Sequence, residues 1–295
     1  KEERPLKVFT GNFGSRQVAV IETVFETQYG GHTPTRSMDD YLAHLPFLAG
    51  RYTSHREYST NNIEMLLGEL RQDAKEWRAT ELRSVVLLNR KGYFEMRPLP
   101  WEAQLAPVFG ITVSDFDLDG LEDLFLAQNF FANRTGVPRH DAGRGLLLRG
   151  DGTGGFRPVP GQISGIAVYG EQRGSATCDF DHDGRPDLVV TQNAAETKLY
   201  RNEGLTRGLR VRINGGSGNP NGAGCIIRLK SANGFTPARE IHAGSGYWSQ
   251  DSAVPILAIP PEANRGPLEL ELRRPGGGRR LITAPSGLKE VQIDF

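Results

Sequence analysis

Two short acidic segments of the chain have the residue types and spacing of a site for a hard cation. Each has the pattern Asp-x-Asp-x-Asp-Gly-x-x-Asp, once at residues 115–123 and again at residues 179–187. Carboxylates brought this close together repel one another by on the order of 1 kcal/mol for each pair, even in a high dielectric. A bound divalent ion removes that repulsion, and ligation by oxygen atoms alone favours Ca²⁺ over zinc or copper. The sequence therefore predicts two calcium sites.

The position of each residue within these segments predicts its role. We expect side-chain oxygens from the three alternate aspartates, a backbone carbonyl from the residue after the glycine, and a closing carboxylate from the last aspartate. The expected ligands are Asp115, Asp117, Asp119, Leu121 and Asp123 in the first segment and Asp179, Asp181, Asp183, Arg185 and Asp187 in the second. An EF-hand is excluded, because its twelfth position needs a glutamate where Leu126 and Val190 stand. Asp/Gly turns without a metal are the alternative interpretation.

Repeated strand patterns accompany the two acidic segments. Residues 85–94 and 146–156 each have a run of apolar residues, a turn with glycine and a returning segment with an aromatic residue, and residues 199–204 look like a shortened third copy. This pattern predicts three β-hairpins. A repeat of about 60 residues with four short strands is typical of a propeller blade.

A segment at about residues 37–80 interrupts the β pattern. Ser37, which is followed by two aspartates, predicts the start of a helix, and Pro46 is expected to end or kink that helix. Apolar residues at helical spacing between Ile63 and Leu70 predict an amphipathic helix. We therefore expect a helical insert here, inside the first blade.

The repeat stops at about Leu205, and alternating apolar and polar residues follow. Residues 209–214 and 268–273 alternate strictly, which predicts half-buried strands of an antiparallel sheet. Further strands are expected at 225–229, 254–259 and 291–295. The predicted fold is mainly β, with partial β-propeller blades and the helical insert at residues 1–204, followed by a small β-sandwich or barrel-like domain at residues 205–295.

Composition and charge exclude several classes of protein. The 295-residue chain has 35 basic and 35 acidic residues, a net charge of zero, which argues against a nucleic acid as partner. No apolar run approaches the roughly 20 residues that span a bilayer, so no membrane span is expected. The start of the chain, Lys1 to Pro5, is highly charged and lacks the apolar core of a signal peptide, so we expect that any export signal has been removed or never existed. Cys178 and Cys225 lack the spacing of a zinc motif, and the sequence leaves open whether they form a disulfide.

The acidic segments and the strands beside them resemble the FG-GAP/VCBS repeats of integrin-α-like β-propellers. The resemblance implies a structural Ca²⁺ in each acidic loop. Residues 12–15, Asn-Phe-Gly-Ser, look like a degenerate copy without carboxylates, for which we expect no metal. The C-terminal part is similar to an ASPIC/UnbV domain, through Asn-Gly-Ala-Gly at 221–224 and Gly-Ser-Gly-Tyr-Trp-Ser-Gln at 244–250. Three blade-like units are too few for a propeller of roughly 4–8 blades, so we expect a part of a longer protein or an open array completed by self-association.

These observations predict a non-enzymatic, exported module for extracellular or envelope binding or adhesion, with Ca²⁺ as a structural ion. It would be secreted, periplasmic or on the cell surface and would bind a protein or carbohydrate ligand that the sequence does not identify. Tyr247 and Trp248 are candidates for a sugar- or peptide-binding surface, with core packing as the alternative. The alternative function is a propeller-based hydrolase or lyase. Ser245 and Ser249 near His242 lack the G-x-S-x-G setting of a nucleophile, so no catalytic residue is predicted.

Overall fold

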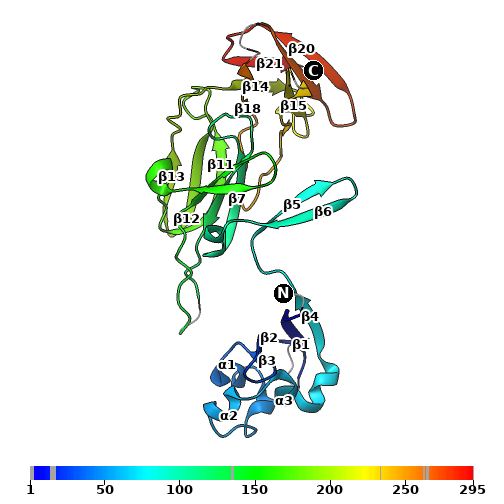
Figure 1. The fold of residues 1–295 in the computed structure, drawn as a ribbon, viewed down its shortest axis with the longest axis vertical. Helices are drawn as coiled ribbons and strands as arrows, with labels where there is room; N and C mark the ends of the chain where they lie inside the picture. The colour runs from blue at the N-terminus through cyan, green and yellow to red at the C-terminus, as the bar shows by residue number, and fades with distance from the viewer. Residues whose placement is uncertain are drawn as a thin grey trace. The chain divides into compact units, whose positions relative to one another are not determined.

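The fold consists mainly of short antiparallel strands, as predicted (Figure 1). The computed structural model describes residues 3–13, 18–133, 136–232, 234–261, 263 and 266–294. The chain divides into two compact units, Lys1–Arg83 and Ser84–Phe295, which are described separately below.

The first unit is a four-stranded antiparallel sheet with a helical insert. Its strands follow the spatial order β3-β2-β1-β4 and are β1 (Leu6–Gly11), β2 (Ala19–Glu26), β3 (Gly31–Pro34) and β4 (Lys75–Ala79). The chain between β3 and β4 forms α1 (Met38–Leu42), η1 (Pro46–Leu48), α2 (His55–Ser59), α3 (Ile63–Leu67) and η2 (Gly68–Asp73). The insert thus joins the two edge strands of this sheet.

Local sequence signals explain where the insert begins and ends. The Ser37 side chain accepts a hydrogen bond from the Asp40 N–H, and the Asp40 side chain bonds back to the Ser37 N–H, a capping box that starts α1. Pro46 is the first residue of η1, after α1 has ended. The insert is shorter than expected, because residues 75–79 pair with β1 as strand β4 instead of remaining helical.

The core of the first unit lies between its sheet and its helices. Phe9 and Ile21 from the sheet and Leu45, Leu66 and Leu67 from the insert are buried in one cluster. The apolar stripe of the helix predicted between Ile63 and Leu70, which forms α3 and the start of η2, is therefore packing surface. The segment that resembles a degenerate acidic loop lies between β1 and β2, and its Gly14 and Ser15 fall outside the described residues.

The second unit begins with three groups of strands. The hairpin of β5 (Val85–Arg90) and β6 (Tyr93–Pro98) is followed by η3 (Trp101–Gln104) and by a meander of four antiparallel strands. The meander contains β7 (Val108–Ser114), β8 (Asp123–Gln128), β9 (Leu146–Gly150) and β10 (Phe156–Val159). After α4 (Gly161–Ser164) come β11 (Glu171–Cys178), β12 (Asp187–Asn193) and β13 (Ala195–Tyr200), again antiparallel.

Two of the three expected hairpins are confirmed, and the third is wrong. The β5–β6 and β9–β10 pairs are the first two copies. After β13, residues 201–208 form no strand. Side-chain hydrogen bonds hold this stretch instead: the Asn202 N–H donates to Asp187, and the Arg185 guanidinium donates to the Gly204 carbonyl at 2.8 Å.

The first strands of the two blade-like sheets lie side by side. The Thr112 hydroxyl on β7 and the Ser175 hydroxyl on β11 are 2.6 Å apart. A Cβ atom at Gly110 would lie 2.6 Å from the Arg173 carbonyl oxygen, so this approach requires a glycine. A shared apolar cluster that includes Phe125 and Val190 fills the space between the two sheets.

The C-terminal residues form two small sheets around one core. One sheet has the order β18-β14-β21, and the other has the order β16-β15-β19-β20 with β17 beside β15. The strands are β14 (Leu209–Asn214), β15 (Ile226–Ser231), β16 (Gly234–Phe235), β17 (Arg239–Glu240), β18 (Ile256–Leu257), β19 (Leu268–Arg273), β20 (Arg279–Ala284) and β21 (Glu290–Asp294). Buried residues from both sheets share a single cluster, in the manner of a small β-sandwich.

One feature of this region differs from the expectations. Strands β14 and β21 are parallel, because they are joined through the whole second sheet and not by a hairpin. The C-terminal residues belong to the same compact unit as the strands before them and form hydrogen bonds to those strands. The domain boundary predicted near residue 204 stays a prediction. Cys178 and Cys225 are free thiols. Among the described residues, no helix combines the length and apolar character needed to cross a bilayer.

Candidate metal centres

Both acidic segments lie in equivalent loops of the two blade-like sheets. The first connects β7 to β8, and the second connects β11 to β12. Cross-strand pairing of Ser114 with Asp123, and of Cys178 with Asp187, closes the loops at matching positions. The strand ends therefore bring the first and last aspartate of each loop together.

Each loop gathers three carboxylates around one centre. In the first cluster, Asp115, Asp117 and Asp123 each offer an oxygen that lies within 4.8 Å of the others, and Asp179, Asp181 and Asp187 form the second cluster in the same way. Oxygen ligands bind Ca²⁺ at about 2.3–2.6 Å, so a separation of up to roughly 5 Å suits two ligands of one ion. Six of the ten predicted ligands thus lie in two clusters that could each hold an ion.

Backbone N–H groups fix the buried aspartates in both loops by the same scheme. Asp115 accepts hydrogen bonds from the N–H groups of Asp119 and Gly120, at 3.1 and 2.9 Å. Asp123 accepts from Phe116 at 3.0 Å and from Gly150 at 2.9 Å. The corresponding bonds of Asp179 and Asp187 repeat this arrangement in the second loop.

The backbone of the loops has the same unusual conformation. Leu118 and His182 occupy equivalent positions with φ of 58° and 59°, and the following turn places Gly120 and Gly184 at φ of 89° and 85°. Positive φ is costly for residues other than glycine and is retained where the surroundings enforce it. The two loops therefore have the same backbone conformation at equivalent positions.

The remaining predicted ligands lie outside the clusters. The Asp119 carboxylate accepts a hydrogen bond from the Leu121 N–H at 2.9 Å, and the Asp183 carboxylate accepts one from the Arg185 N–H at 3.1 Å. Asp183 also pairs with the Arg185 guanidinium. The Asp119 and Asp183 carboxylates and the Leu121 and Arg185 carbonyls remain predicted ligands.

Sequence reasoning missed the arginines that face the clusters. Arg149, at the end of β9, pairs with Asp117 and lies 3.3 Å from Asp119. Arg201, just after β13, pairs with Asp181 at 2.6 Å. The hairpin repeat could have revealed these arginines. Leu-Arg-Gly at 148–150 and Tyr-Arg-Asn at 200–202 place an arginine at the same position of the second and third copies.

The C-terminal sheets contact both loops through further arginines. Arg239 of β17 pairs with Glu122 in the first loop. Arg210 of β14 pairs with Asp179 in the second loop and donates to Glu290 at 2.8 Å. Among the described residues, no arginine pairs with Asp115 as Arg210 pairs with Asp179, although the charge of Arg239 acts on Asp115. The two centres thus share ligand geometry but differ in charge compensation.

Burial leaves the first cluster under electrostatic strain. Desolvation raises the pKa of Asp115 to about 6, and it raises the pKa of Asp123 to about 6 as well. Burial also raises the pKa of Asp187 in the second loop. A carboxylate with such a raised pKa is poorly compensated when charged, and a bound cation supplies the missing compensation. An all-oxygen donor set in which two of the three aspartates are buried fits a calcium ion.

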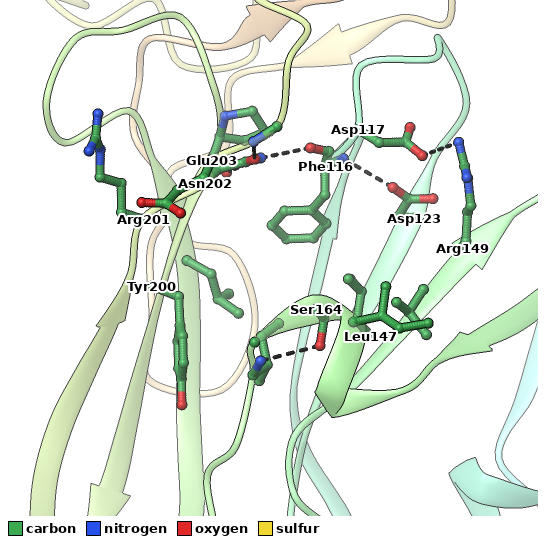
Figure 2. Close-up of a pocket in the computed structure, with 17 residues that line it drawn as sticks. Phe116, Asp117, Asp123, Leu147, Arg149, Ser164, Tyr200, Arg201, Asn202 and Glu203 are labelled. Carbon is green, nitrogen blue, oxygen red and sulfur yellow. Dashed lines mark hydrogen bonds and ion pairs between the residues drawn. The ribbon is translucent and has the colours of Figure 1, made fainter.

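A cavity of about 680 Å³ opens beside the first cluster (Figure 2). Figure 2 shows Asp117 and Asp123 on one side of it, near Arg149, and Tyr200 with Arg201 on the other side. The Asn202 side chain donates a hydrogen bond to the Phe116 carbonyl at 2.7 Å, which connects the two sides. The cavity therefore lies between the two blade-like sheets.

The repeated loops have a counterpart in a known family. A family model of the FG-GAP-like repeat matches residues 115–190, which contain both acidic loops. The match does not reach the C-terminal region, whose similarity to an ASPIC/UnbV domain stays a prediction. No curated protein matches the chain in sequence. The chain thus contains an FG-GAP-like repeat at residues 115–190.

Proposed function

We propose that this protein is a non-enzymatic, exported binding module whose FG-GAP-like repeat is stabilised by two calcium ions. The observation that supports this most directly is the pair of equivalent loops, each with three carboxylate oxygens within 4.8 Å of one another. FG-GAP-like repeats are typically extracellular, where calcium is present at millimolar concentration and sites of modest affinity are filled.

In this proposal the carboxylates of each loop hold the ends of two strands together. Asp115 and Asp123 lie at the ends of β7 and β8, and Asp179 and Asp187 lie at the ends of β11 and β12. Their backbone hydrogen bonds aim the oxygens at one point before any ion arrives. The ion would neutralise the buried charges, so its role is structural.

The binding role is proposed from the arrangement of the sheets. Between Ser84 and Tyr200 the described residues provide one four-stranded blade, one three-stranded blade and a separate hairpin, and these form no closed ring. Further repeats or a second copy of the chain would complete the array. A protein or carbohydrate is the ligand class that we propose for such a module.

Calcium titration of the full chain tests the metal assignment. We expect isothermal titration calorimetry to give a stoichiometry of two, and each of Asp117→Ala and Asp181→Ala to lower it to one. Asp141→Ala removes an exposed aspartate outside both loops and serves as the matched control. Calcium should also raise the melting temperature, because a ligand that binds only the native state stabilises it. An unchanged stoichiometry in both loop variants contradicts the proposal.

A further inference from the structure

Asn202, which follows β13 and is not a predicted calcium ligand, contacts both acidic loops. Its backbone N–H donates a hydrogen bond to Asp187, the last aspartate of the second loop, at 2.8 Å. Its side-chain amide donates to the Phe116 carbonyl of the first loop at 2.7 Å and to the Pro186 carbonyl of the second loop at 3.1 Å. One residue therefore holds the backbone of one loop against the backbone of the other.

These contacts are part of a continuous chain of three hydrogen bonds between the two carboxylate clusters. Phe116, whose carbonyl accepts from Asn202, donates its own N–H to Asp123 at 3.0 Å. Asp123 and Asp187, at the two ends of the chain, are almost completely buried, at 3 % and 1 % exposed. Figure 2 shows the two bonds that join Asn202 to Phe116 and Phe116 to Asp123. The position of an aspartate in one cluster thus depends on the position of an aspartate in the other.

The corresponding position of the first blade is a glycine. The Gly150 N–H donates to Asp123 at 2.9 Å, which is the bond that the Asn202 N–H makes in the second loop. A Cβ atom at Gly150 would collide with the Glu122 carbonyl oxygen, so a side chain does not fit there without a shift of the backbone. The backbone donor is common to both loops, whereas the side-chain contact to the neighbouring loop is specific to Asn202.

This arrangement predicts the sign of an interaction between the two calcium sites. If Asp187 is fixed by an ion in the second loop, the Asn202 N–H is fixed with it. The Asn202 amide then holds Phe116 where its N–H orients Asp123 for the first site. A ligand that meets an already ordered site loses less conformational entropy on binding, which gives positive cooperativity. Thermodynamic linkage requires the same effect in the reverse direction.

We propose that Asn202 couples the two calcium sites, so that calcium bound in either loop raises the calcium affinity of the other. Asn202 is a positioning residue, because its amide acts on the carboxylates through Phe116 and not on the ion. The proposal rests on the proposed function, because it needs both calcium sites. The stoichiometry tests the sites and the coupling factor tests Asn202, so the two proposals can fail separately.

Calcium titrations of the full chain measure the coupling without any change at Asn202. Asp181→Ala leaves the first loop to bind alone, and Asp117→Ala leaves the second. The product of the two wild-type association constants should exceed the product of these single-site constants by about fivefold or more, since coupling factors are usually about 5–150. Equal products overturn the proposal and leave the calcium sites standing. Fewer than two sites in the wild type overturn both proposals.

Asn202→Ala locates the coupling, because it keeps the backbone N–H for Asp187 and removes the amide. We expect the stoichiometry to stay at two, and the same comparison of products in this background to give a factor close to one. Such a double-mutant cycle separates the coupling from a general loss of affinity. Asn193→Ala is the matched control, because its amide bonds to Glu171, at 2.6 Å and outside both loops. It should retain the wild-type factor.

A purely structural role of Asn202 predicts a different outcome. Loss of the bonds to Phe116 and Pro186 would then lower the melting temperature and both calcium affinities, with the coupling factor unchanged. Asn202→Asp supplies a second variant, which lacks the amide donor but keeps the oxygen that accepts from the Gly204 N–H at 2.9 Å. Melting scans in calcium and in chelator verify that both variants fold. A wild-type coupling factor in both Asn202→Ala and Asn202→Asp overturns the proposal.

Discussion

The guanidinium of Arg210 pairs with the carboxylate of Asp179, and both side chains are almost completely buried, at 5 % and 1 % exposed. Arg210 belongs to β14 of the C-terminal sheets, and Asp179 is the first aspartate of the second acidic loop. The same arginine donates to Glu290 of β21 at 2.8 Å. The second acidic loop and the C-terminal core are therefore connected by one buried ion pair.

Replacement of Arg210 by methionine should destabilise the second unit, most strongly without calcium. Loss of one partner of a buried ion pair typically costs about 3–5 kcal/mol, because the other charge remains buried and uncompensated. A calcium ion at Asp179 would supply part of the lost compensation, so we expect a smaller loss in calcium than in chelator. Urea unfolding followed by tryptophan fluorescence measures both values.

Arg212→Met is the matched control for this prediction. Arg212 also bonds to Glu290, at 2.9 Å, but its side chain is 44 % exposed and has no contact with the acidic loop. Its loss should cost about 1 kcal/mol or less, with or without calcium. If calcium fails to reduce the cost of Arg210→Met, the coupling between ion and arginine does not exist.

Calcium binding should weaken as the pH falls below about 6. Burial raises the pKa of Asp115 and of Asp123 to about 6, so protons compete with calcium in this range. The calcium-free protein should behave in the opposite way. Its folded state binds these protons more tightly than the unfolded chain does, so its free energy of unfolding gains from these groups as the pH falls from about 7 to 5.

Melting temperatures at pH 5, 6 and 7, with and without calcium, measure the two trends. Asp115→Asn removes one of the carboxyls with a raised pKa, so in chelator its stability should depend less on pH than that of the wild type. Carboxylates whose pKa is lowered do not titrate between pH 5 and 7 and so do not obscure these trends. Glu171 is an example. Burial opposes the lowering of its pKa, but hydrogen bonds from Phe131, Asn193 and Arg173 bring that pKa to about 2. Equal pH slopes in variant and wild type would refute the assignment.

Features that depend on neighbouring residues were predictable from the sequence. The aspartate spacing identified both loops, and the capping residues located the start of α1, because these patterns act within one or two turns of chain. The alternation in residues 209–214 identified β14 and its buried face, with Leu209 and Val211 inside.

Features that depend on distant segments were not predictable in this way. The same alternation suggested an antiparallel sheet with polar residues on its open face, yet β14 pairs in parallel with β21 and Arg210 is buried. Arg210 turns inward because Asp179, 31 residues earlier in the chain, provides its counter-charge. Strand direction and charge pairing are set by tertiary contacts that a single sequence pattern does not encode.

Replacement of Arg149 by alanine should raise the calcium affinity of the first loop. Arg149 pairs with Asp117 and lies 3.3 Å from Asp119, so its positive charge competes with a cation for the same oxygens. Because the pair is partly exposed, we expect a gain of about two- to fivefold, equivalent to about 0.4–1 kcal/mol. Arg157→Ala, on the neighbouring strand β10, is the control. Lower calcium affinity in Arg149→Ala would show that Arg149 orients the ligands instead.

Gly110→Ala should separate the two blade-like sheets from one another. A Cβ atom there would lie 2.6 Å from the Arg173 carbonyl oxygen, a backbone atom that moves only if β11 moves. Overpacking of this kind costs about 1–3 kcal/mol, and the shift would also strain the contact between Thr112 and Ser175.

Gly218→Ala is the control, because a Cβ atom at Gly218 meets nothing within 4 Å. Hydrogen exchange should be faster in β7 and β11 of Gly110→Ala alone. Since both acidic loops extend from these strands, unchanged exchange there would mean that each blade holds its acidic loop without support from the other.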